Sequence, residues 1–99
     1  MQYVEIRKPW AVVRVNGELI NTVMLQLNAE LETAYQNGCT QVCFDLLQTT
    51  DIESAGISGM MKIYKKVGKE NFAVINPNSE ITETFASAAL EGWIRSDIN

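Results

Sequence analysis

A short polar stretch in the middle of the chain holds the side chains best suited to chemistry. It reads Asp51-Ile52-Glu53-Ser54-Ala55-Gly56-Ile57. An apolar run leads up to this stretch and a helical pattern leads away from it. This arrangement predicts a loop that feeds the start of a helix, with Ser54 at or next to the N-cap. Because a helix N-terminus carries a partial positive charge, a phosphate on Ser54 would be favourably placed there.

The composition argues against the common kinds of enzyme site. The chain has no histidine, so a Ser-His-Asp or Cys-His site cannot be built. The glycines are scattered and no Gly-Lys-Ser or Gly-Lys-Thr sequence occurs, so no phosphate-binding loop is expected. Asp45, Asp51 and Glu53 could together hold a hard cation, and this metal-protein or small-enzyme hypothesis stays open as an alternative. The main expectation is a protein without catalytic residues, cofactor or bound metal.

The length and the charge of the chain indicate what kind of protein it is and which partners are unfavourable. Ninety-nine residues, 46% of them hydrophobic and 20% charged, predict one folded domain over residues 1–99. Eight Lys and Arg residues against twelve Asp and Glu residues give a net charge of −4, which argues against a nucleic-acid partner. The N-terminus lacks a signal-peptide pattern, and no apolar run approaches the length of a membrane span. We therefore expect a cytoplasmic protein that does not insert into a membrane.

Hydrophobic periodicity divides the chain into strands and helices. Strands are expected over residues 3–6, 10–15, 41–47 and 71–75, and helices over residues 18–36, 57–67 and from residue 79 onward. The first two strands suggest an antiparallel hairpin, and the later strand–helix–strand steps imply parallel pairing. The result is an α/β fold with one mixed sheet, a parallel β-α-β core, and helices on one or both faces.

Two helices carry specific expectations about capping and burial. In the first helix, which Asn37-Gly38 should end, Glu30 is expected on the solvent face. Ser79 is the expected N-cap of the third helix. In the second helix the expected inward residues are Ile57, Met60, Met61, Tyr64 and Val67. Its expected outward residues are Lys62, Lys65, Lys66 and Lys69, which are interpreted as a solvated face, with a docking role as the alternative.

The two cysteines and the C-terminal tail complete the pattern. Four residues of strand would separate the Cα atoms of Cys39 and Cys43 by about 13 Å. That distance is too long for a disulfide, so both are expected to be reduced thiols. The tail holds Trp93, Ile94 and Ile98, which fit either a last half-helix or a short strand.

Four short motifs carry a resemblance to a known family. They are Val15-Asn16-Gly17-Glu18-Leu19, Phe44-Asp45-Leu46, Glu53-Ser54-Ala55-Gly56-Ile57 and Asn76-Pro77. In this order and spacing the chain resembles a STAS domain, the fold of bacterial anti-sigma factor antagonists, over essentially all of residues 1–99. The resemblance implies a single α/β domain with a mixed sheet and about three to four helices.

The resemblance also implies a function without catalysis. In the antagonists, a serine in the loop-to-helix signature is phosphorylated by a partner serine kinase that doubles as an anti-sigma factor. The unmodified form binds that kinase, and a PP2C-type phosphatase resets the switch. The implied docking residues in this chain are Asp51, Glu53, Ser54, Ala55, Gly56 and Ser58.

This chain departs from the signature at the usual acceptor position, which is Ala55. Ser54 is then the best remaining acceptor candidate, with Ser58 one helical turn further on as the second. An acid–hydroxyl–Ala–Gly pattern also resembles the small STAS subunits of lipid-transport ABC complexes, which dock onto an ATPase without a phosphoswitch. A protein partner is expected in both cases. Gly56 is expected to tolerate substitution poorly if a neighbouring strand or a partner approaches it closely.

Overall fold

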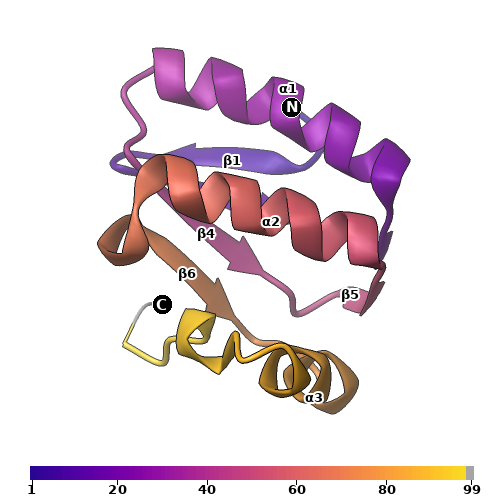
Figure 1. Ribbon diagram of the computed structural model, residues 1–99. Coiled ribbons are helices and arrows are strands. Elements are labelled where there is room, and N and C mark those ends of the chain that lie inside the picture. Colours follow the sequence, from indigo (N-terminus) through magenta and orange to yellow (C-terminus); the bar gives the residue numbers. More distant parts are fainter. Residues whose placement is uncertain (98–99) are drawn as a thin grey trace.

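A four-stranded sheet lies at the centre of the computed structural model, which describes residues 1–97 (Figure 1). Its strands, in spatial order, are β1 (Val4–Arg7), β2 (Trp10–Arg14), β4 (Gln41–Asp45) and β6 (Phe72–Ile75). β1 and β2 form the predicted antiparallel hairpin, whereas β2, β4 and β6 run parallel. The predicted mixed sheet with a parallel core is confirmed, and β4 occupies a central position.

Two further strands, β3 (Gly17–Leu19) and β5 (Thr49–Ile52), form a separate parallel pair. Both were missed by the sequence pattern. The expectation that a helix begins at Glu18 was wrong, as was the expectation that Asp51 lies in a loop. Strands of three and four residues are too short to display a clear alternation, and these two pair only with each other.

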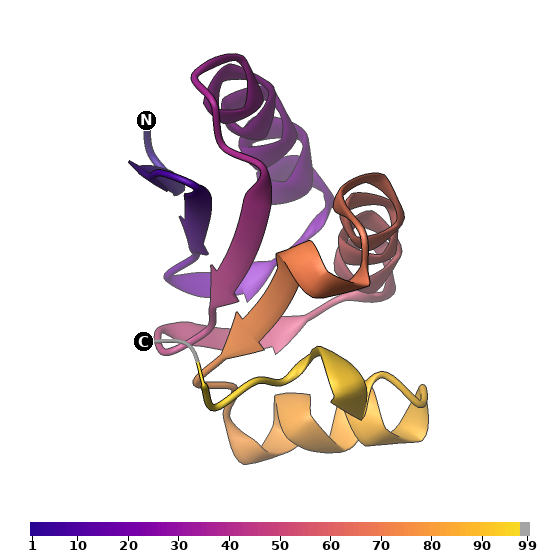
Figure 2. The same ribbon diagram turned by 90° about the vertical axis from the view of Figure 1, so that its left-hand side faces the viewer.

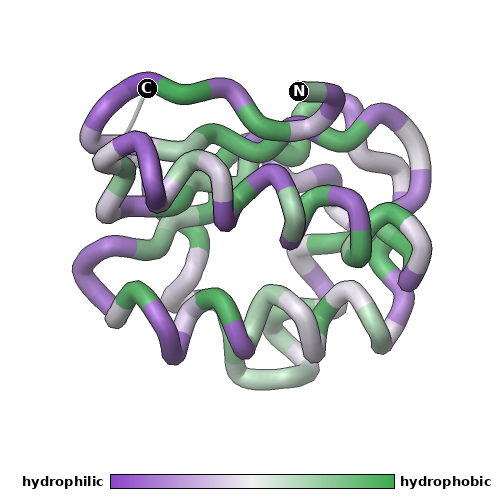
Figure 3. Tube along the Cα trace, turned by 90° about the horizontal axis from the view of Figure 1, so that it is seen from above, coloured by the Kyte–Doolittle hydropathy of each residue, from purple (hydrophilic) through white to green (hydrophobic). Residues whose placement is uncertain are grey.

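Within residues 1–97, three helices accompany the strands, and the first two pack on one face of the four-stranded sheet (Figure 2). They are α1 (Asn21–Gln36), α2 (Ser54–Val67) and α3 (Ser79–Ser87), with 3₁₀ turns η1 (Lys69–Asn71) and η2 (Glu91–Trp93). α1 and α2 lie side by side over the sheet, while α3 lies beyond β6 (Figures 1 and 2). Apolar and hydrophilic segments alternate along the helical tubes in Figure 3, as expected of helices with one buried face.

The core lies between this face of the sheet and the helices. Phe44 is fully buried on β4, and α2 contributes Met60, which was predicted, and Ile63, which was not. The rings of Phe72 and Trp93 meet edge-on with centroids 5.1 Å apart. The residues of this core that come from the helices and the tail are Met24, Leu27, Leu31, Ala34, Met60, Ile63, Ile81, Phe85 and Trp93.

Glu30 corrects the predicted solvent face of α1, because it is only 6% exposed. Its Oε1 accepts hydrogen bonds from the backbone N–H groups of Tyr3 and Val4, at 2.8 and 3.0 Å. Its Oε2 accepts a third from the Gln26 amide at 3.1 Å. Burial alone would raise the pKa of Glu30, but these donors hold it below its usual value. The carboxylate therefore ties the start of β1 to α1.

Other local expectations had mixed outcomes. α1 ends at the predicted Asn37-Gly38 turn, where Gly38 has φ +97°. The predicted cap Ser79 is wrong, since Asn78 is the N-cap of α3 and accepts a hydrogen bond from the Ile81 N–H. The tail combines both predicted alternatives, because η2 is followed by a single parallel bridge from Ile94 to β6. Ile98 lies outside the described residues.

The cysteines are free thiols and the lysines of the second helix are exposed, as the sequence predicted. Cys39 and Cys43 are both buried and form no disulfide. Burial, together with the nearby Asp45 carboxylate, raises the pKa of Cys43 to about 11. The four lysines of α2 and the following turn are all exposed. Within residues 1–97, no helix has the length and apolar character needed to cross a bilayer.

Candidate functional site

The predicted docking stretch spans the end of β5 and the start of α2. In β5, Thr50 and Asp51 are exposed and Ile52 is buried. Glu53 is the N-cap of α2, and its N–H donates to the Leu19 carbonyl of β3 at 3.1 Å. The neighbouring strand thus fixes the backbone at this point, while the carboxylates on either side of Ile52 face solvent.

Ser54 is the first residue of α2, next to the N-cap as predicted. Both Ser54 and Ser58 are exposed, and their four-residue spacing puts them on one face of the helix. Ala55, between them, is half-buried. Among the described residues, no side chain caps the N-terminus of α2 and its first turn holds no acid. The partial positive charge of this helix end is therefore not offset by a carboxylate within the helix.

Gly56 allows α2 to approach β3 and β5 closely. A Cβ atom at this position would lie 2.7 Å from Ile52 Cγ2 and 2.8 Å from the Leu19 carbonyl oxygen. Real Cβ atoms do not approach other atoms so closely, and the backbone oxygen cannot move aside without disturbing β3. Gly56 is buried. Its role in the predicted docking stretch is therefore to position the start of α2.

The start of α3 lies against the same strand. The Asn78 side-chain amide donates to the carbonyl oxygens of Thr49 and Thr50, at 3.4 and 3.2 Å. Beside these contacts is a surface hollow of about 340 Å³ between the β4–β5 connection and the start of α3. Its lining residues are Leu47, Gln48, Thr49, Thr50, Asn78, Ser79 and Glu80. We call residues 47–58 together with 78–80 the α2-start surface.

Leu47 is a feature of this surface that the sequence pattern missed. It was expected to be the last residue of a buried strand, but β4 ends at Asp45 and Leu47 is 72% exposed. Leu47 lies in the turn that leads to β5, so the burial of both faces of β4 does not extend to it. Leu47 thus adds an exposed apolar side chain to the α2-start surface, beside the hollow.

Asp45 does not join the other acids. One of its carboxylate oxygens accepts from the Asn76 amide at 3.0 Å and from the Leu47 N–H at 3.2 Å. The other oxygen accepts from Arg14 Nε at 3.2 Å. Within the part of the chain that the structure describes, no three acidic or cysteine side chains gather in a way that could hold a metal ion. The geometry therefore lends no support to a cation site made of Asp45, Asp51 and Glu53.

Comparison with solved structures identifies proteins of the same fold. The anti-sigma factor antagonist SpoIIAA in its unphosphorylated form superposes with a TM-score of 0.78 and 19% identity, over 93% of this chain and 84% of that one. The phosphorylated form of SpoIIAA from Bacillus gives 0.72 and 20%, over 93% and 86%. A candidate anti-sigma factor antagonist from Thermotoga maritima gives 0.78 and 16%, over 93% and 81%.

Comparison by sequence agrees with the fold. A search of curated proteins found no significant match. The sequence profile of the STAS domain, however, matches residues 2–98, which is nearly the whole chain. These findings confirm the resemblance drawn from the four motifs: the chain belongs to the STAS domain family.

Proposed function

We propose that this STAS domain is a non-enzymatic regulatory module of the anti-sigma factor antagonist type. It docks a partner serine kinase or anti-sigma-type regulator through residues 51–58, and phosphorylation of Ser54 controls the docking. The observation that carries the proposal is Ser54 itself, an exposed hydroxyl at the first position of α2 that does not cap the helix. Further support comes from SpoIIAA, which shares the fold and has been solved with and without phosphate.

The switch would act on surface charge and not on the fold. A phosphate on Ser54 adds roughly −1.5 to −2 charges at neutral pH. The first-turn N–H groups of α2 stabilise an anion at this place, so the helix start keeps its conformation. Beside the exposed carboxylates of Asp51 and Glu53, the phosphate creates a strongly negative patch. A partner that accepts the neutral serine is then repelled, or a phosphatase of the PP2C type is attracted.

Apolar contacts would supply much of the affinity for the partner. Leu47 projects from the α2-start surface beside the hollow next to α3, and apolar anchors set in a polar surround dominate many protein interfaces. In this proposal Leu47 supplies an apolar contact to the partner, and a phosphate on Ser54 lowers the affinity. Replacement of Leu47 by Ala should therefore weaken docking of the unmodified protein.

The test incubates the protein with ATP and an anti-sigma-type kinase encoded near its gene, followed by intact-mass and fragment-mass analysis. We expect one phosphate on the wild type and on Ser58→Ala, and none on Ser54→Ala. A phosphate that persists in Ser54→Ala and disappears in Ser58→Ala would transfer the switch to Ser58. An unmodified wild type would overturn the phosphoswitch, and binding of the same kinase would then test docking separately.

A second candidate function is favoured by one position. Ala55 occupies the usual acceptor site and has no hydroxyl, which suits a STAS accessory subunit of a lipid-transport ABC ATPase complex without a phosphoswitch. In this case the same α2-start surface would dock the ATPase permanently. Co-purification from native extract distinguishes the two functions. Recovery of an ABC ATPase without any kinase of the anti-sigma type would favour the second.

A further inference from the structure

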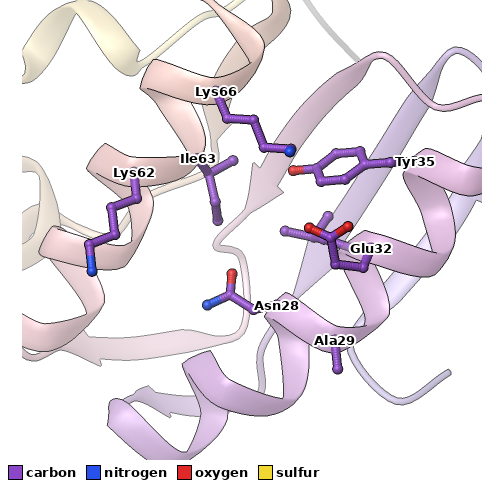
Figure 4. A pocket seen from close by; sticks show the side chains of 8 residues that line it. Asn28, Ala29, Glu32, Tyr35, Lys62, Ile63 and Lys66 are labelled. Carbon is purple, nitrogen blue, oxygen red and sulfur yellow. The ribbon is translucent and has the colours of Figure 1, made fainter.

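A groove runs between α1 and α2, and its lining does not include the α2-start surface. Its volume is about 290 Å³, and Figure 4 shows side chains from both helices around it. The floor is apolar, because Leu31 and Ile63 are 1% and 5% exposed. We call this feature the α1–α2 groove, and define it by Asn28, Leu31, Glu32, Tyr35, Lys62, Ile63 and Lys66.

Two lysines mark successive turns along one wall of the groove. Lys62 and Lys66 are four residues apart on α2, so they lie on the same helix face. Lys66 reaches across the groove, with its ammonium 5.1 Å from the centre of the Tyr35 ring, whereas Lys62 points in another direction (Figure 4). The two cations are therefore spread along the groove and do not converge on a single point.

The charge of this region differs from that of the whole protein. The chain has a net charge of −4, yet Lys62, Lys65, Lys66 and Lys69 follow one another over two turns. All ion pairs found within residues 1–97 use arginine and none uses lysine. On the facing wall of the groove, α1 presents one acid, Glu32. The positive charge of Lys62 and Lys66 is thus left without a salt-bridge partner in this part of the molecule.

We propose that the α1–α2 groove binds an acidic amphipathic helix of a protein partner. Two carboxylates one helical turn apart on the partner would pair with Lys62 and Lys66, and an apolar side chain between them would pack on the half-buried Tyr35 ring and on the aliphatic stems of the two lysines. Tyr35 keeps its proton, since burial and the Glu32 charge raise its pKa to about 12, so its hydroxyl remains a neutral donor. This geometry fits a row of carboxylates better than a single phosphate, because the two ammonium groups do not converge on one point (Figure 4). Glu32 on the α1 wall restricts the partner's carboxylates to the α2 side of the groove.

The test pans a displayed library of random helical peptides against the intact protein. Enriched peptides should carry pairs of Asp or Glu four residues apart, flanked by apolar residues. Their affinity, measured by fluorescence anisotropy, should fall about tenfold in Lys62→Gln/Lys66→Gln, because each exposed pair contributes a modest energy. The matched control, Lys65→Gln/Lys69→Gln, makes the same change in net charge outside the groove, and should change affinity less than about threefold.

Chemical-shift mapping with an enriched peptide should place the largest changes on α1 and α2 around Tyr35 and Ile63. The proposal is overturned by a panning that enriches no acidic pairs, by equal losses in the two lysine variants, or by shift changes confined elsewhere. Vesicles of phosphatidylcholine and phosphatidylglycerol provide a further arm. If they bind the protein, and only Lys62→Gln/Lys66→Gln abolishes this binding, the groove contacts lipid and the helix assignment is wrong.

Discussion

The starts of α2 and α3 both contact β5, but different interactions hold them in place. Asn78 fixes α3 through polar contacts, since its side chain accepts from the Ile81 N–H and donates to two carbonyl groups of β5. Among the described residues, α2 has no such cap. Its start is located by the close packing of Gly56 on Leu19 and Ile52 and by one backbone hydrogen bond from Glu53.

This difference bears on the switch that we propose at Ser54. Modification of a capping side chain would break the contacts that hold the helix. Ser54 has no capping role, so in the proposed switch its hydroxyl would gain or lose a phosphate while packing underneath keeps α2 in place. A surface that changes its charge without changing its fold needs this separation between the groups that support it and the groups that it displays.

The largest effect is expected where packing holds α2. Gly56→Val should lower the free energy of unfolding by about 3 kcal/mol, because the added carbons overlap the Leu19 carbonyl and the Ile52 side chain. Urea denaturation measures this. Gly92→Ala is the matched control, since a Cβ there meets no atom within 4 Å, and should change stability by less than about 1 kcal/mol. Equal effects would contradict the packing account.

Substitution of Glu30 compares the stability contributed by a buried polar contact with that contributed by the packing of Gly56. Glu30→Ala should cost about 2 kcal/mol, because the Tyr3 and Val4 N–H groups lose a charged acceptor in a buried position. Urea denaturation at neutral pH measures the loss. A cost below about 0.5 kcal/mol would mean that water replaces the carboxylate and that the anchor is weak.

The same residue gives a dependence on pH. The pKa of Glu30 is lower in the folded protein than its usual value of 4.5, so its stabilisation is complete above that value. It is then lost as the pH falls through the lowered pKa. In Glu30→Gln, whose amide does not titrate, this part of the acid destabilisation should be absent. Parallel acid-induced decreases in the two proteins would contradict the assignment.

Asn78→Ala should have a smaller effect on stability, about 1 kcal/mol, since the cap and its two links to β5 are lost together at a partly exposed site. Hydrogen exchange should become faster in the first turn of α3 and remain unchanged in the first turn of α2. Faster exchange in both helix starts would indicate that they are coupled through β5, and the contrast between them would fail.

The smallest stability change is expected at Ser54. Ser54→Ala should alter the free energy of unfolding by less than about 0.5 kcal/mol, because the hydroxyl is exposed and caps nothing. Thermal or urea denaturation checks this. A loss of more than about 1 kcal/mol would mean that Ser54 supports the helix after all. The groups that hold α2 in place and the groups exposed on its surface would then not be separate.

Much of this arrangement follows from local patterns. Period-two and helical spacing predicted the hairpin, the parallel core and the helices, and Gly38 marked the end of α1. Ser54 was predicted beside the N-cap, since the change of period falls at that position. These features depend on neighbouring residues alone.

The features that sequence reasoning missed depend on distant neighbours. Glu30 resembles a solvent-facing residue of α1, but the backbone of β1 passes beside it and supplies donors. β3 and β5 acquire their strand conformation only by pairing with each other. No local pattern contains this information. The error at Ser79 is different, because Asn is as favoured as Ser at an N-cap and the capping bond of Asn78 to the Ile81 N–H is local.

The short β3–β5 pair also determines where the two long helices begin relative to each other. Leu19 and Ile52 are paired across it, and α1 and α2 each begin two residues after these partners. The starts of the two helices are therefore held together by this strand pair and by the close approach of Gly56 to Leu19 and Ile52. At their other ends, α1 and α2 lead into β4 and β6, which also pair with each other. A partner of the α1–α2 groove would therefore meet two walls that paired strands anchor at both ends.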